Sequence, residues 1–166
     1  FEEGSVVGVE LAARLDNQLP SWWDGLDPLV ASRVAASRDM PAHTYLDRRY
    51  KIQALTAAMT QSLEDHDVDL MVLPTVPISP PVLDDLTGDD DGAAYRAANM
   101  AMLRNTCFGN ITGMCGVSLP IGLDNNGMPV GIQILAPGGE DFALIAMGAA
   151  LEAAFARAGL WPGPGR

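Results

Sequence analysis

A short apolar run followed by closely spaced prolines constrains the fold more than any other feature of this sequence. Residues 68–74 read Val-Asp-Leu-Met-Val-Leu-Pro, and further prolines follow at positions 77, 80 and 81. Each proline fixes its own φ and restrains the residue before it, so no helix continues through this stretch. A continuous apolar run this short is typical of a buried strand. We therefore predict a strand over 70–73 that ends in a rigid extended loop, which can form one wall of a pocket.

Helical patterns lie on both sides of this strand. Apolar residues recur at helical spacing over 5–18, and Asp27 before Pro28 is a typical helix start, with the aspartate as N-cap. Residues 42–66 form a long amphipathic pattern, and an Ala- and Met-rich helix is predicted over 93–104. The last predicted helix covers 140–157, where acidic residues favour the start and Gly159 ends it.

A second pair of strands is predicted near the C-terminal end. Residues 117–121 and 130–135 are apolar, and Asp-Asn-Asn-Gly at 124–127 joins them with the positive φ that a hairpin turn needs. Residues 84–92 are predicted to be an acidic loop. Helices therefore alternate with buried strands, which places the chain in the α/β class.

The composition of the 166 residues excludes several classes of function. Hydrophobic residues make up 48% and the net charge is −11, with Lys51 as the single lysine. Without a basic stripe, nucleic-acid and anionic-membrane partners are not expected, and no apolar run is long enough to span a bilayer. We expect a cytoplasmic protein. Arg48, Arg49 and Lys51 either hold an anionic substrate or form a solvated helix face. The chain starts at Phe1, so it need not begin where translation begins.

No catalytic or metal-binding motif stands out. Cys107 and Cys115 lie eight residues apart and far from the two histidines, so reduced thiols are favoured over a zinc site. No serine lies in a Gly-x-Ser-x-Gly elbow, and Ser118 falls inside a predicted strand, where a hydroxyl is usually structural. We expect neither a metal nor a cofactor, and no catalytic residue is assigned in this chain.

Three segments resemble conserved parts of one enzyme family. Residues 69–77 resemble a strand and a Pro-Thr-x-Pro loop, 110–122 an Asn-x-x-Gly segment that runs into Ser-x-Pro-x-Gly, and 127–134 a Gly-x-Pro-x-Gly-x-Gln strand. The same order, closed by a helix, occurs in the amidase signature family.

The resemblance covers residues 41–157, whereas 1–40 match loosely and 158–166 form a tail. Residues 1–166 are accordingly predicted to be the C-terminal segment of a single amidase domain.

The resemblance implies an α/β/α amidase signature fold, with a mixed central sheet flanked by helices, that hydrolyses amides. Family members use a Ser–cis-Ser–Lys triad, but this sequence has no Ser-Ser pair, and Lys51 falls on a predicted helix. The serine nucleophile is therefore expected upstream of Phe1, which makes the upstream half of the same amidase a partner of this chain. On this reading the 166-residue chain is inactive alone. The alternative is a non-catalytic fragment or degenerate paralogue that acts only as a binding module. The sequence leaves open whether the protein forms a homo-oligomer.

The resemblance also bears on the substrate, a small-molecule amide. Members that release ammonia for tRNA-dependent amidation place an acidic residue just before the Asn-x-x-Gly segment, where this chain has Leu103 and Arg104. A plain amidase acting on another amide is therefore favoured. Arg104, Asn105 and Thr106 are expected to border the acyl pocket and bind substrate. A structural ion pair is the alternative for Arg104.

Overall fold

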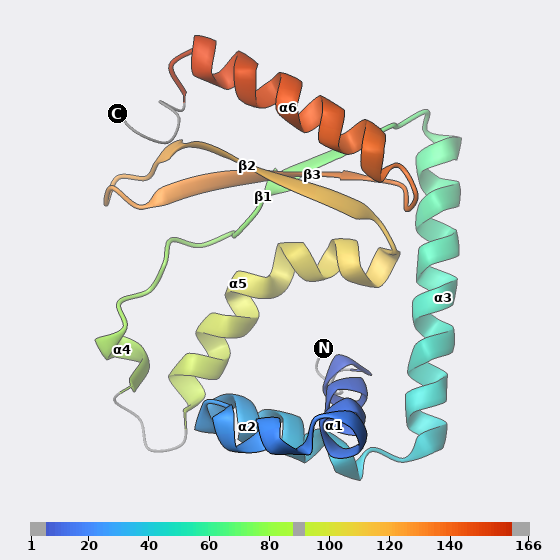
Figure 1. Cartoon of the computed structure of the whole chain (residues 1–166). Helices are drawn as coiled ribbons and strands as arrows, with labels where there is room; N and C mark the ends of the chain where they lie inside the picture. Colours follow the sequence, from blue (N-terminus) through green and yellow to red (C-terminus); the bar gives the residue numbers. More distant parts are fainter. Residues whose placement is uncertain (1–5, 88–91, 161–166) are drawn as a thin grey trace. The chain divides into compact units, whose positions relative to one another are not determined.

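The computed structural model describes residues 6–87 and 92–160, and the chain forms two compact units (Figure 1). The first unit covers Phe1–Ala54 and the second Leu55–Arg166. Each unit is described by itself below. Residues 161–166 of the predicted tail and residues 88–91 of the predicted acidic loop lie outside the described residues.

The first unit is helical, as the sequence predicts. Helix α1 covers Val6–Gln18, the 3-10 helix η1 Pro20–Gly25, α2 Pro28–Ala35, and η2 Ala36–Asp39, and α3 begins at Ala42. The predicted start of α2 is confirmed, because the Asp27 side chain accepts a hydrogen bond from the Leu29 N–H at 2.9 Å. Such an N-cap satisfies one of the N–H groups that a helix leaves unpaired.

The small core of the first unit lies between α1 and α2. It consists of Ala12, Leu15 and Val34, each at most 3% exposed. Trp23 packs against this core, and its indole N–H donates to Asp16 at 3.0 Å. The Arg38 guanidinium lies 4.3 Å from the centre of the Trp23 ring and also pairs with Asp16. The tryptophan is thus held by a cation–π contact and a hydrogen bond as well as by burial.

The second unit combines a sheet with helices and contains all three predicted strands. Strand β1 covers Met71–Pro74, β2 Cys115–Leu123, and β3 Pro129–Ala136. They form one sheet in the order β1-β3-β2, and every pairing among the described residues is antiparallel. The predicted α/β class is confirmed, with no parallel pair in the described part of the sheet.

Helices cover both faces of this sheet. The long helix α3 ends at Asp65, α4 covers Asp84–Thr87, α5 Ala93–Thr112, and α6 Asp141–Arg157. Helices α5 and α6 lie on opposite sides of the strands (Figure 1). Leu119, Ile134, Ala136 and Leu144 form the core on the α6 side. On the other side Leu135 comes close to two glycines of α5 and β2, Gly109 and Gly116, where a side chain would not fit without a shift of the leucine.

Strand β1 is less buried than its apolar sequence predicts. Its residues alternate between half-buried and exposed, and Val72 is 59% exposed. The reason is its position at the edge of the sheet, since α6 packs on β2 and β3. By contrast, the last four residues of the central strand β3 are buried.

Two predicted boundaries differ from the structure. Helix α5 extends eight residues beyond the predicted end at 104, and it stops at Gly113, whose φ is +69°. The following N–H, of Met114, returns to the Gly109 carbonyl at 3.0 Å, which is a typical glycine-capped helix end. Residues 84–87, predicted as part of a loop, form the single turn α4. Residues 88–91 lie outside the described residues.

The predicted hairpin turn between β2 and β3 is organised by Asp124. One oxygen of its carboxylate accepts hydrogen bonds from the Asn126 and Met128 N–H groups at 2.8 and 2.9 Å. The other accepts from the Ser79 hydroxyl at 2.6 Å. Gly127 supplies the predicted positive φ, +78°. The hydrogen bond from Ser79, followed by those from the backbone, holds the pKa of Asp124 below its ordinary value.

This lowered pKa predicts an acid sensitivity of the turn. Because the folded state lowers the pKa, the stabilisation by Asp124 is present at neutral pH and is lost as pH falls through the folded-state pKa, below about pH 4. We expect Asp124→Asn to remove part of the pH dependence of unfolding in that window. Urea unfolding of both proteins from pH 3 to 7 checks this. Equal pH dependence of the variant and the parent would contradict it.

Candidate functional site

Asn105 connects α5 to two strands of the sheet. Its side-chain N–H donates to the Pro74 carbonyl at 2.7 Å, at the end of β1. Its backbone carbonyl accepts a hydrogen bond at 3.0 Å from the side chain of Gln133, in β3. Gln133 is only 5% exposed, so its side-chain N–H forms this hydrogen bond in a place that water does not reach. Asn105 therefore fixes the helix against the point where the proline-rich loop begins.

The first loop residue, Thr75, is fixed by the sheet itself. Its N–H donates to the Gly131 carbonyl at 2.9 Å, and its hydroxyl lies 2.6 Å from that of Ser118. A side chain at position 131 would meet these two hydroxyls at 3.0 and 3.3 Å, so glycine makes room for the pair. The rigid loop wall predicted from the prolines thus starts at a well-anchored corner.

This corner is polar but has no activated nucleophile. The Thr75 and Ser118 hydroxyls bond to each other, and neither is a base strong enough to activate the other. The chemistry available here is hydrogen bonding and positioning. The prediction that Ser118 is structural agrees with this pairing.

The three predicted substrate residues have different surroundings. Arg104 is exposed and forms no hydrogen bond or ion pair within the described part of the chain. Asn105 points to the sheet, and the Thr106 hydroxyl donates to the Leu103 carbonyl of its own helix at 3.1 Å. Successive residues of a helix point in directions about 100° apart, so the three side chains do not share one surface. Of the three, the structure leaves Arg104 with a side chain available to a ligand.

Sequence reasoning did not identify Gln133 or Thr75 as members of this network. The sequence signal for Gln133 was present, since it is the one polar side chain within the apolar segment 130–135. A polar residue inside a buried strand needs a partner, and here that partner is the helix backbone. For Thr75 no local pattern identified the partner, because Ser118 is 43 residues away.

The two cysteines are free and half-buried, in line with the prediction of reduced thiols. Burial raises the pKa of the Cys107 thiol, which makes it a poorer nucleophile at neutral pH. The Cys115 thiol donates to the Pro137 carbonyl at 3.3 Å. Within residues 6–87 and 92–160 no group of three His, Cys, Asp or Glu side chains could hold a metal ion. In the same residues no helix is long and apolar enough to cross a membrane.

Comparison with known proteins defines the class. The family model described as Amidase matches residues 24–145, which include β1, all of α5 and the β2–β3 hairpin. The chain belongs to the amidase signature family, as the resemblance of its segments indicated. A solved structure described as an amidase superposes with a TM-score of 0.69 at 27% identity, covering 89% of this chain and 33% of that one.

Individual relatives share parts of this sequence. The 2-amino-5-chloromuconic acid deaminase of Comamonas testosteroni is 37% identical over 153 residues, which are 92% of this chain and 32% of the relative. The 6-aminohexanoate-cyclic-dimer hydrolase of Paenarthrobacter ureafaciens is 38% identical over 92 residues, covering 52% of this chain and 19% of the relative. The chain therefore spans a third or less of the length of these relatives.

Proposed function

We propose that these residues are the C-terminal part of an amidase. The enzyme adds water across a carboxylic amide and releases the acid and ammonia or an amine, using a serine nucleophile upstream of Phe1. The observation that carries the proposal is the amidase match over residues 24–145, in a chain that has no Ser-Ser pair of its own. The upstream half of the same amidase is the proposed partner. We propose a cytoplasmic enzyme without metal or cofactor.

In this proposal Arg104 borders the acyl side of a small-molecule substrate. Its exposed guanidinium has no partner within the described residues, and an arginine is suited to a carboxylate or a polarised carbonyl. In this proposal Asn105 and Thr106 act through the position of helix α5, since their side chains do not share a surface with that of Arg104. Asn105 holds α5 against the end of β1 through its hydrogen bond to the Pro74 carbonyl. Thr106 is the next residue of the helix, and its hydroxyl donates to the Leu103 carbonyl.

A second candidate function is deamination of an unsaturated amino acid. It is favoured by the relative from Comamonas testosteroni, which matches 92% of this chain, whereas the cyclic-dimer hydrolase matches 52%. Both reactions release a nitrogen leaving group, so one assay covers both candidates.

The experiment is an ammonia-release assay on the full-length protein that contains these residues. Probes are propionamide, benzamide and succinamic acid for the amidase, and 2-aminomuconate for the deaminase. Turnover of an amide, abolished when the upstream serine is replaced by alanine, supports the first candidate. Turnover of 2-aminomuconate alone supports the second. No turnover of any probe by a folded protein favours the non-catalytic module.

The 166-residue chain alone is predicted to hydrolyse none of these amides. Its sequence has no Ser-Ser pair, and within the described residues the Thr75 and Ser118 hydroxyls bond to each other and not to a base. The same assay, run at equal molar concentrations of the short chain and the full-length protein, checks this. Turnover by the pure short chain that disappears in Ser118→Ala or Cys107→Ala would show that it carries its own nucleophile.

A further inference from the structure

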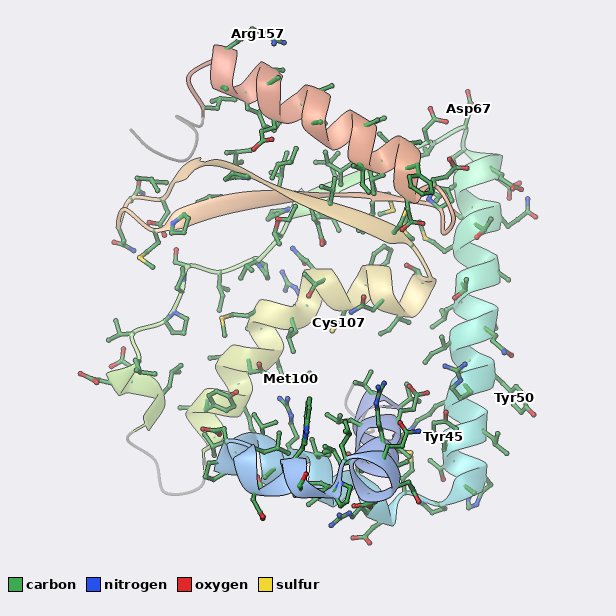
Figure 2. All side chains as sticks on the ribbon, viewed as in Figure 1. Tyr45, Tyr50, Asp67, Met100, Cys107 and Arg157 are labelled. Atoms are coloured by element: carbon green, nitrogen blue, oxygen red, sulfur yellow. The ribbon has the colours of Figure 1, made fainter. Side chains whose placement is uncertain are left out.

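A groove of about 690 Å³ lies within the second unit, on the side of the sheet that α6 covers. It opens between the end of α3, the segment 67–70 and the first turns of α6. Asp67, labelled in Figure 2, lies just past the end of α3. The base of the groove is apolar, with Leu63 and Leu144 only 6% and 3% exposed and Met147 beside them.

Four carboxylates line this groove: Glu64, Asp67, Asp69 and Glu140. All four residues are exposed, and none forms an ion pair within the described part of the chain. No lysine, arginine or histidine is among the lining residues. The groove therefore presents an apolar base with uncompensated negative charge around it.

The helix dipole makes this arrangement more unusual. Helix α3 has 24 residues and no basic residue in its last turn, so Glu64 and Asp67 stand at the negative end of a long helix. Cations are stabilising at that end and carboxylates are not. At this end the His66 ring nitrogen lies 2.8 Å from the Ser62 carbonyl, but no ion pair within the described residues involves Glu64 or Asp67. Carboxylates left so at a helix C-terminus are typical of a surface that something else completes. Here the missing complement is positive charge.

We propose that this groove binds a polypeptide segment that places apolar side chains on the Leu63–Leu144 base and arginine or lysine side chains against the four carboxylates. Charge complementarity identifies the occupant, since nucleic acids and anionic lipids are repelled by the rim. A small hydrophilic cation makes no use of the apolar base, whereas a helix or strand with both kinds of side chain uses both. The volume is that of a groove for several side chains. This proposal does not depend on the amidase reaction.

The test uses the full-length protein and a labelled amphipathic peptide, acetyl-Leu-Arg-Arg-Leu-Leu-Arg-Arg-Leu-amide with a fluorophore on an added C-terminal cysteine. Fluorescence anisotropy measures its Kd for the parent and for the groove variant Glu64→Gln/Asp67→Asn/Asp69→Asn. The matched control is Asp24→Asn/Asp39→Asn/Glu152→Gln, which removes the same charge at exposed positions elsewhere. We expect the groove variant to bind about tenfold more weakly and the control to stay within about twofold of the parent.

Four results would overturn the proposal. Equal weakening by both triple variants would show that the peptide senses only the net charge. Equal binding of a peptide with serine in place of leucine, or full competition by equimolar spermidine, would show a site for small cations. Absence of binding to the folded parent protein would show that the groove is already filled by another part of the protein.

Discussion

Replacing Gly138 with alanine is expected to lower the free energy of unfolding by about 3 kcal/mol. A Cβ at this position would collide with the Gly113 carbonyl oxygen, which is backbone and has little freedom to move. Gly113 has a φ of +69°, and the Thr56 side chain fills the space beside it, so Gly113 has little room to shift. The contact joins the end of α5 to the loop after β3, so relief of the clash must displace one of them.

The matched control for this substitution is Gly25→Ala. No atom lies within 4 Å of a Cβ built at Gly25, so alanine is tolerated there and reduces the freedom of the unfolded chain. Urea unfolding of the two variants and the parent, at one pH, measures both effects. A loss below about 0.5 kcal/mol for Gly138→Ala would mean that the two backbone segments move apart easily.

Substitutions of the neighbouring residues Asn105 and Arg104 are expected to affect different quantities, the free energy of unfolding for Asn105 and KM for Arg104. Asn105→Leu removes the donor to the Pro74 carbonyl and should lower the free energy of unfolding by about 2 kcal/mol. Arg104→Ala removes an exposed side chain without a partner in the described residues and should change it by less than about 0.5 kcal/mol. Under the proposed function, Arg104→Ala instead raises KM for the amide, since a substrate contact is lost.

Asn105→Asp separates the hydrogen bond from packing. It keeps the shape of the side chain but replaces the N–H donor with an acceptor that faces the Pro74 carbonyl. Unfolding free energy and KM are measured for all three variants of the full-length protein. A raised KM with unchanged stability in both Asn105 variants would assign this residue to substrate contact. Lowered stability in Arg104→Ala would assign the arginine to the structural role instead.

The elements that the sequence predicted well are those with local causes. The N-cap at Asp27, the turn at 124–127 and the strand that ends at Pro74 each depend on residues a few positions apart. Periodicity gave α3 and α6 with boundaries close to those observed. In these segments the chemistry of side chain and backbone decides the conformation before any distant contact forms.

The features that the sequence did not predict depend on distant partners. Helix α5 continues through Asn105 and Gly109 to Gly113 because Leu135 and Gln133 of β3 pack and hydrogen-bond against that stretch. The low helix propensity of this last stretch, taken alone, favours an earlier end of the helix. For the same reason the Asn105–Pro74 bond could not be read from spacing, since the two residues lie 31 positions apart. Burial of β1 was overestimated because a run of apolar residues does not reveal whether a strand is central or at an edge.

The strand order has a consequence for how the second unit forms. β2 and β3 are joined by a short turn and can pair as soon as both are synthesised, on the microsecond timescale of hairpins. Met71 of β1 pairs with Leu135, so β1 cannot pair with β3 until roughly sixty further residues have emerged from the ribosome. During that interval Val72 and its apolar neighbours have no strand beside them within the described residues. Late docking of β1 onto a finished hairpin is thus the expected slow step, and a nascent chain halted before β3 is the form most exposed to aggregation.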